Sequence, residues 1–544
     1  MPKMTGGEAL VKSLYVEGVR VLFGLPGVQI YHALDALVDE PRIQFITTRH
    51  EQATTYMADG YARTSGKIGA SLVVPGPGLL NASAGIATAY AASSPILIVS
   101  GQIQRDLIGI RRGVLHEIDD QLDTIAPVTK WRCRILDPKG IPAAINEAFY
   151  YLRTGRPRPV EIEIPPDTLS EIADVEILDP AIIPIQAPDS NRIQEAVKMI
   201  TSAKNPIFWA GGGAISSNAS KILLELAVHL QAQVVTTPEG KGMIPEDHYL
   251  SAGVMAGRGD QLLADNDLII SIGSRMANFN TAASSSTGLT DIEISSDKRP
   301  QVIQIDIDPE EIGRNYTKTF GLVGDARTTL ESIFKIIACT TPASPNRADE
   351  FIASKDKTKG NGILEPQNSF TSAIRSAIPR DAIVVSGMTQ IGYYSRRHLP
   401  MYDPRTYITS SYLGNLGYAY PTALGAKVAN PNKTVVALSG DGGFLFNSQE
   451  LATAVQYGIN VIAIVFNDNA YGNVLRDQTK QFNGRVMGSR LHNPDFLKLA
   501  ESYGVKGIKA EGPEELRDAL EMQIANPSPT LIEVPVEMMP SPFN

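Results

Sequence analysis

Short apolar runs recur along the whole chain, and each is followed by a glycine-rich turn and then by a helical pattern. Continuous apolar strands that alternate with helices are typical of parallel sheets covered on both faces. The pattern therefore predicts an α/β fold of doubly wound parallel sheets. The predicted strands are Val21–Phe23, Ala70–Val74, Ile96–Ser100, Pro206–Ala210, Val234–Thr237, Leu268–Ile272, Val302–Ile307, Ala382–Ser386, Val435–Leu438 and Val461–Phe466.

Two segments interrupt this alternation and are predicted to be linkers. Ser170–Asp189 is rich in Pro, Asp and Ile without a helical period, and Thr340–Gln367 combines prolines with alternating Lys and Asp. Each remaining block is long enough for one doubly wound sheet. The predicted domains are residues 1–170, 190–340 and 366–544. The chain end, Glu533–Asn544, is predicted to lie as a tail on the surface.

Composition and charge exclude several classes of protein. The 544 residues include 49 Lys and Arg against 58 Asp and Glu, a net charge of −9, whereas nucleic-acid-binding proteins normally carry a basic face. No apolar run approaches the roughly 18 residues of a membrane span, so neither nucleic acid nor a membrane is an expected partner. Cys133 and Cys339 are the only cysteines, which fits a reducing compartment and predicts a cytoplasmic protein.

The most informative segment contains two strands that each end in a polar, glycine-rich turn. One leads into Ser-Gly-Asp-Gly-Gly at 439–443, and the next leads into Asn-Asp-Asn-Ala-Tyr-Gly at 467–472. Parallel strands open at the same edge of a sheet, so Asp441 and Asp468 can meet there. Paired carboxylates suit Mg²⁺ with a phosphate ligand, and the glycines leave N–H groups free to face a diphosphate. Gly-Asp-Gly alone could be a turn, but the separation of 468 − 441 = 27 residues fits one intervening helix.

These residues resemble the fingerprint of the thiamine-diphosphate-dependent enzymes. Gly440-Asp441-Gly442, then Asn467-Asp468, then Tyr471-Gly472 follow the order and spacing of that family. The resemblance implies thiamine diphosphate as cofactor, with Mg²⁺ bound by Asp441, Asp468 and the backbone carbonyl of Ala470. The family usually has Asn where this chain has Asp468. Either side chain supplies an oxygen, but Asp adds a negative charge.

A second match to this family lies in Ile-Thr-Thr-Arg-His-Glu-Gln-Ala at 46–53. The pattern places Glu51 at a strand-to-helix junction, where its side chain can contact a ligand. In the family, a Glu here hydrogen-bonds the aminopyrimidine ring of the cofactor and favours its imino tautomer, so the resemblance implies this catalytic role for Glu51. The alternative is a first-turn Glu that only stabilises the helix dipole.

Other segments extend the resemblance to the rest of the cofactor site. Gly-Asn-Leu-Gly-Tyr at 414–418 is similar to the family segment that folds thiamine diphosphate into a V. The Gly414 carbonyl would accept a hydrogen bond from the 4′-amino group, and Leu416 would lie between the two rings. Taken alone, Leu416 would be interpreted as a core residue. The further cofactor-binding residues that the resemblance implies are Pro26, Asn81, Thr389, Gln390, Gly440, Gly442, Gly443, Tyr471, Gly472 and Asn473.

The resemblance covers nearly the whole chain and is closest to the acetolactate-synthase-like branch. It extends to Asp-Gly-Tyr-Ala-Arg at 59–63, Gly-Gly-Gly at 211–213 and Ile-Asp-Ile-Asp-Pro at 305–309. It implies three α/β domains, which are pyrimidine-binding, central and diphosphate-binding in chain order. It also implies a homodimer or homotetramer with active sites at the dimer interface, because domains of different subunits share one cofactor.

The chain departs from biosynthetic acetolactate synthases where the family contacts substrate. Leu-His-Glu at 115–117 replaces Phe-Gln-Glu, Asp477 replaces a Trp, and Val28 and Gln29 replace two small residues. Three of these polar residues are predicted to be catalytic. His116 and Glu117 could carry protons to and from the reacting group, and the Gln29 amide could orient a carboxylate or carbonyl. Alternatively, the His–Glu pair could simply cap a helix.

The leading hypothesis is thiamine-diphosphate- and Mg²⁺-dependent decarboxylation of a 2-oxo acid, with carboligation to a second carbonyl. The alternatives are a non-decarboxylating C–C lyase or hydrolase of hydroxyketones or diketones, a simple 2-oxo acid decarboxylase, and a cofactor-binding paralogue with a regulatory role. FAD or an adenine nucleotide in the central domain is not favoured, because a lone glycine cluster is weak evidence. Arg258 and Arg275 could contact a diphosphate there or be structural.

Overall fold

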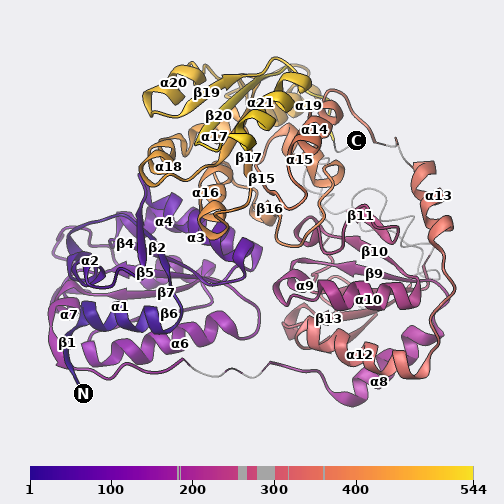
Figure 1. Cartoon of the computed structure of the whole chain (residues 1–544). Helices are drawn as coiled ribbons and strands as arrows, with labels where there is room; N and C mark the ends of the chain where they lie inside the picture. Colours follow the sequence, from indigo (N-terminus) through magenta and orange to yellow (C-terminus); the bar gives the residue numbers. More distant parts are fainter. Residues whose placement is uncertain are drawn as a thin grey trace.

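Three parallel sheets, each with six strands and a cover of helices, make up the computed structural model of the chain (Figure 1). The structure describes residues 1–180, 183, 185–254, 266–277, 300–316, 318–358, 360 and 362–542. Each sheet belongs to one domain, called here the first, central and third domain. The predicted α/β architecture of three doubly wound parallel sheets is confirmed.

The sheet of the first domain has the order β3-β2-β4-β5-β7-β6. Its strands are β2 (Val21–Gly24), β3 (Gln44–Thr47), β4 (Gly69–Val73), β5 (Ile96–Gly101), β6 (Trp131–Arg134) and β7 (Val160–Ile164). Its α-helices are α1 (Gly6–Val16), α2 (Tyr31–Val38), α3 (Glu51–Ser65), α4 (Pro77–Ala92), α5 (Gln121–Ile125), α6 (Ile141–Arg153) and α7 (Pro166–Ser170).

The sheet of the third domain, β16-β15-β17-β18-β20-β19, repeats this order strand for strand. Its strands are β15 (Ile383–Ser386), β16 (Tyr407–Thr409), β17 (Val435–Gly440), β18 (Ile462–Asn467), β19 (Lys506–Lys509) and β20 (Thr530–Pro535). Its α-helices are α14 (Gln367–Ala377), α15 (Gln390–His398), α16 (Ala419–Ala429), α17 (Asp441–Leu445), α18 (Leu451–Tyr457), α19 (Gly472–Gln481), α20 (Phe496–Ser502) and α21 (Pro513–Ala525).

The central sheet has a different order, β11-β10-β9-β12-β13-β14, in which the chain starts in the middle and reverses direction once. This is the strand order of dinucleotide-binding folds. Its strands are β9 (Pro206–Ala210), β10 (Gln233–Thr236), β11 (Ser251–Val254), β12 (Leu268–Ile272), β13 (Gln301–Asp306) and β14 (Thr319–Val323). The α-helices described around it are α8 (Ser190–Ser202), α9 (Gly212–Ser216), α10 (Ser220–Leu230) and α12 (Ala326–Thr340).

All of the strands predicted from apolar runs are present, but the linkers and the tail are more structured than predicted. Part of the first linker forms β8 (Ile172–Asp174), which pairs antiparallel with β1 (Lys3–Thr5). The second contains helix α13 (Ala348–Thr358). The tail prediction is wrong in part, because Glu533 belongs to β20 and Met539 is only 2% exposed.

Two helices join the first domain to the third. In Figure 1, α3 and α16 lie against each other where the two domains meet, and they cross at two glycines. A Cβ atom on Gly60 would lie 2.0 Å from the carbonyl oxygen of Thr422, and one on Gly425 would lie 2.0 Å from that of Met57. Only glycine allows so close an approach of the two backbones. The apolar core at this crossing is continuous between the two sheets.

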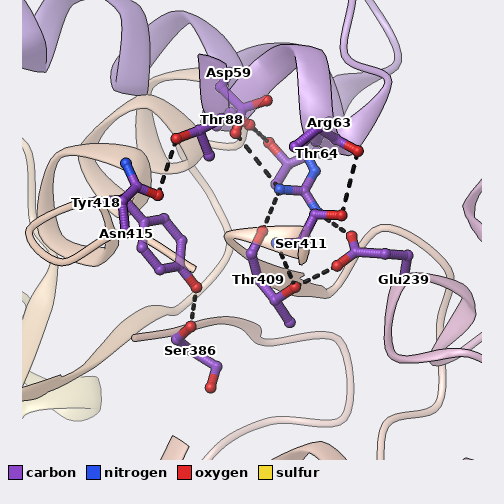
Figure 2. A network of polar contacts seen from close by, with 12 residues as sticks. Asp59, Arg63, Thr64, Thr88, Glu239, Ser386, Thr409, Ser411, Asn415 and Tyr418 are labelled. Carbon is purple, nitrogen blue, oxygen red and sulfur yellow. Dashed lines mark hydrogen bonds and ion pairs between the residues drawn. The ribbon is translucent and has the colours of Figure 1, made fainter. Parts of the chain in front are cut away.

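A buried polar cluster joins all three domains (Figure 2). The Arg63 guanidinium on α3 forms an ion pair with Glu239 of the central domain, and it donates to the Thr409 carbonyl of the third domain at 2.6 Å. Thr409 also donates its hydroxyl to Glu239. Asp59, one turn earlier on α3, lies 3.5 Å from Arg63 and is fully buried, and burial raises its pKa.

Candidate active site

The two acidic residues predicted to bind Mg²⁺ lie together at one edge of the third sheet. Strands β17 and β18 are parallel neighbours, with Gly440 opposite Phe466. Asp441 follows β17 directly and begins α17, and Asp468 follows β18. The sheet therefore brings the two carboxylates to the same place from positions far apart in the sequence, as predicted.

The electrostatics of this pair fit a divalent cation. Burial and the neighbouring Asp441 carboxylate raise the pKa of Asp468 to about 7, and burial also raises the pKa of Asp441. Two buried like charges destabilise each other unless a cation lies between them. The side chains are hard oxygen donors of the kind that Mg²⁺ prefers. The donor set thus suits the metal that the family implies.

Neighbouring amides fix the orientation of both carboxylates. Gln390 Nε2 donates to Asp468 Oδ2 at 2.8 Å, and Asn493 Nδ2 donates to Asp441 Oδ2 at 2.6 Å. The Gln390 carbonyl oxygen in turn accepts from Arg476 at 3.1 Å and from the Met539 N–H at 3.0 Å. Sequence reasoning missed Asn493 and Arg476. Asn493 precedes a Pro-Asp helix start, where Asn is interpreted as a turn residue, so nothing in the pattern marked it.

A cavity of about 260 Å³ opens beside the two carboxylates. Twelve of the residues predicted for the cofactor and metal line it: Thr389, Gln390, Leu416, Gly440, Asp441, Gly442, Gly443, Asp468, Ala470, Tyr471, Gly472 and Asn473. A Cβ atom on Gly472 would lie 2.1 Å from Asp468 Oδ2, so a larger residue here would displace this carboxylate oxygen. Among the described residues, every one that lines this cavity belongs to the third domain.

The carboxylate predicted to act on the pyrimidine lies at the edge of the first sheet. Glu51 is the first residue of α3 and is 9% exposed. Asn81, on the exposed side of α4, donates to Glu51 Oε2 at 3.0 Å. His50 caps the helix by accepting from the Gln52 N–H, which is a structural role. Glu51 and Asn81 thus meet, but neither lines the cavity of the third domain in the same chain.

Two of the predicted catalytic residues contact each other in a loop of the first domain. Gln29 Nε2 donates to the Leu115 carbonyl at 3.2 Å, which turns Gln29 Oε1 toward His116 Nδ1 at 3.1 Å. This favours the His116 tautomer with a proton on Nδ1 and a lone pair on Nε2. Glu117 instead accepts from the Gly113 and Val114 N–H groups at 2.5 and 2.9 Å, and so closes a turn in its own loop.

The remaining predicted residues lie on loops around these centres. Pro26 is exposed just after β2, and Gly414 has a φ of +66°, which favours glycine. Leu416 is half-buried and reaches the cavity instead of the core. The placement therefore groups the predicted residues into two sets, one on each domain.

A larger cavity, of about 760 Å³, lies at the edge of the central sheet where its strand order reverses. Gly211, Gly212, Gly213 and Arg275 line it together with residues of the first domain. The Arg275 guanidinium lies 4.4 Å from the Tyr412 ring centre, and burial lowers its pKa. Arg258 lies outside the described residues.

Three protein-family models match the chain in order. The thiamine pyrophosphate enzyme N-terminal TPP binding domain matches residues 4–124, the central domain matches 193–333, and the C-terminal TPP binding domain matches 387–534. Together they cover most of the chain. Each match contains one of the three sheets described above or most of it.

Similar proteins align over nearly the full length. The probable acetolactate synthase large subunit of Methanocaldococcus jannaschii is 35% identical over 99% of this chain and 93% of its own length. The acetolactate synthase large subunit of Haemophilus influenzae is 35% identical over 96% and 92%. A probable 2-ketoarginine decarboxylase of Pseudomonas aeruginosa is 33% identical over 98% and 94%.

The chain therefore belongs to the thiamine pyrophosphate (thiamine diphosphate) enzyme family. Within the family it is an acetolactate-synthase-like enzyme of the transferase or lyase kind, which confirms the predicted family and enzyme class. Where the structure describes the chain, none of its helices is both long and apolar enough to cross a membrane.

Proposed function

We propose that this enzyme decarboxylates a 2-oxo acid and joins the remaining acyl unit to a second carbonyl compound, with thiamine diphosphate and Mg²⁺ as cofactors. The observation that carries the proposal is the paired carboxylates Asp441 and Asp468 at adjacent strand ends beside a glycine-lined cavity. Full-length similarity to proteins named acetolactate synthase large subunit supports carboligation over other outcomes.

Asp441, Asp468 and the Ala470 carbonyl would hold Mg²⁺, and the backbone N–H groups at Gly442 and Gly443 would face the diphosphate. When bound, thiamine diphosphate supplies a carbon nucleophile for the 2-oxo group and an electron sink for the electrons that CO₂ leaves behind. Gln390 and Asn493 hold the two carboxylates through hydrogen bonds and would orient them for the cation.

Glu51 would hold a proton against the pyrimidine ring, and Asn81 orients its carboxylate through Oε2. His116, with the lone pair on Nε2 that the Gln29 contact favours, would move a proton to or from the substrate oxygen. The contacts of Glu117 favour a supporting role for it, because both its hydrogen bonds close its own loop. A role for Glu117 in proton transfer stays a prediction.

We also propose a homodimer, or a homotetramer built as a dimer of dimers, in which each cofactor lies between the first domain of one subunit and the third domain of another. Glu51 is absent from the cavity of its own chain. Exposed apolar side chains surround both halves of the site, with Val28, Leu80 and Leu115 on the first domain and Phe446 and Val474 on the third. Exposed apolar surface of this kind marks an interaction face.

The remaining proposals concern the domain boundaries, the cellular compartment and the central cavity. We place the domains at 1–170, 190–340 and 366–544, and the enzyme in the cytoplasm, since its two cysteines are free. The central cavity is large enough for a nucleotide, but its glycines and Arg275 alone do not favour FAD. The absorption spectrum of the purified enzyme, with or without a flavin band, tests this.

The direct test supplies pyruvate and a panel of 2-oxo acids with thiamine diphosphate and Mg²⁺, and measures CO₂ together with products by NMR. CO₂ with a 2-hydroxy-3-oxo acid supports the proposal. CO₂ with free aldehyde indicates a simple decarboxylase, which the similarity to a probable 2-ketoarginine decarboxylase also favours. Aldehyde release from acetoin or benzoin without CO₂ indicates the lyase alternative. Absence of any turnover by the wild-type protein with bound cofactor would instead favour the regulatory paralogue.

A further inference from the structure

Gln121 occupies a buried position directly behind the loops of the first domain that carry the predicted site residues. It begins α5 and is 1% exposed. Its Nε2 lies 2.9 Å from both Ser100 Oγ and the Gly101 carbonyl, and 2.8 Å from Glu163 Oε2. On its other side, Oε1 accepts from the Gly76 N–H at 2.9 Å. One amide therefore joins the ends of β5 and β7 to the loop after β4.

The surroundings of this amide permit one orientation only. Glu161 and Glu163 are both fully buried on β7, and burial raises the pKa of each. Ser100 donates to Glu161 at 2.5 Å, and Arg134 pairs with Glu163. A flipped amide would set its oxygen against the Glu163 carboxylate and its NH₂ against the Gly76 N–H. The hydrogen bonds of the Gln121 NH₂ group to the sheet therefore fix the amide so that its oxygen faces the Gly76 N–H.

Gly76 contacts two segments that carry predicted site residues, which are the start of α4 with Asn81 and the loop with His116. It precedes α4 with a φ of +57°, and a Cβ atom there would lie 2.4 Å from the His116 carbonyl oxygen. Its own carbonyl accepts from the Leu80 N–H at 3.0 Å in the first turn of α4. The next residue, Asn81, is the one that donates to Glu51. The position of Gly76 therefore sets the position of both Asn81 and the His116 segment.

We infer that Gln121 is a positioning residue for the Glu51 carboxylate and the His116 loop. It contacts neither the cavity nor Glu51, and acts through the Gly76 N–H and the start of α4. The inference rests on the proposed function of Glu51 for its catalytic consequence, whereas its structural part, the hold on Gly76, stands on the contacts alone. Losing a buried hydrogen bond to a backbone N–H should loosen the loop locally.

The test compares Gln121→Met with Gln121→Glu and with a matched control, Gln523→Met. Gln523 is equally buried at 1% but lies on α21, where its Oε1 accepts from Thr530 at 3.0 Å. Amide hydrogen exchange is followed over residues 74–81 in the protein without cofactor. The rate of hydrogen exchange at C2 of bound thiamine diphosphate and the thermal midpoint are measured in parallel.

We expect Gln121→Met to speed amide exchange in residues 74–81 by about tenfold or more, as loss of one buried hydrogen bond predicts. C2 exchange should slow by a similar factor, while cofactor affinity holds and Gln523→Met changes neither rate. Gln121→Glu keeps an acceptor for Gly76 but faces Glu163, so it should recover C2 exchange as the pH is lowered.

Unchanged amide exchange over residues 74–81 in Gln121→Met overturns the inference. If Glu51→Gln leaves C2 exchange unchanged, the role of Glu51 fails instead, and the amide measurement still decides that of Gln121.

Discussion

The first and third domains have the same strand order, yet they place different chemistry at equivalent strand ends. After its third and fourth strands in chain order, the third domain has Asp441 and Asp468, whereas the first has Pro75-Gly76 and Gln102. After its second strand, the first domain has Glu51 and the third has the loop with Leu416. The difference teaches that topology supplies positions, and that the residues at those positions determine function.

The largest effect should come from removing one of the two strand-end carboxylates that the third domain has and the first lacks at the equivalent positions. Asp441→Ala should weaken thiamine diphosphate binding by about 100-fold or more, because the cation that neutralises the diphosphate loses a ligand. Calorimetry with Mg²⁺ present measures this, and excess EDTA on the wild type should reproduce it. The control is Asp518→Ala, which removes an exposed carboxylate on α21. Unchanged affinity in EDTA would refute the metal site.

The matching change in the first domain should lower the rate and spare affinity. Glu51→Gln keeps the acceptor for Asn81 but cannot hold the proton, so the rate should fall by about 100-fold, as typical for loss of general acid–base catalysis. The affinity for thiamine diphosphate should change little, since the metal and diphosphate contacts lie on the other domain. Single-turnover kinetics separate the two. An equal loss of affinity would contradict the assignment of catalysis to the first domain and of cofactor binding to the third.

Mixing these two inactive variants tests whether the two domains of one site come from different subunits. After subunit exchange, mixed dimers would hold one intact site, and about a quarter of all sites would be active in a two-fold symmetric dimer. Activity and native mass spectrometry follow the recovery. Exchange seen by mass without any return of activity would show that one chain supplies both halves.

A smaller effect is expected from giving the third domain the usual ligand of the family. Asp468→Asn keeps an oxygen donor and removes one of two buried like charges, so activity should stay within about tenfold, or ~1.4 kcal/mol. Steady-state kinetics at saturating Mg²⁺ measure it. Collapse to background would show that the extra charge itself takes part in catalysis.

The last prediction concerns stability instead of activity, and it tests a contact between the two domains. Glu450 accepts from the Arg49 N–H at 3.1 Å, and burial raises its pKa to about 7. Between about pH 4.5 and 7 the unfolded state loses this proton and the folded state keeps it, so the contribution of Glu450 to stability falls as the pH rises, by up to about 3 kcal/mol. Glu450→Gln should therefore gain in melting temperature relative to wild type between pH 5 and 8. A difference that stays constant with pH would contradict this.

Local patterns predicted the strands and the pairing of Asp441 with Asp468, because neighbouring parallel strands joined by a helical crossover end at the same edge, although the crossover contains two short helices, α17 and α18, where one was predicted. They did not predict Asn493, which reaches Asp441 from 52 residues away, or Gln121, whose amide contacts Glu163 across 42 residues. Such contacts depend on how loops pack over strand ends. The missed helix α13 and the buried Met539 have the same origin, since tertiary packing overrides a polar or proline-rich composition.

The buried polar cluster around Arg63 has a consequence for folding of the chain during its synthesis on the ribosome. Arg63 is made 176 residues before Glu239 and 346 residues before Thr409. Until both have emerged, α3 exposes a guanidinium beside the buried Asp59 with no other ionic partner from this cluster. Because domains generally fold as they are synthesised, the first domain can fold early, but this surface of α3 should stay accessible to proteases or chaperones until Thr409 has emerged.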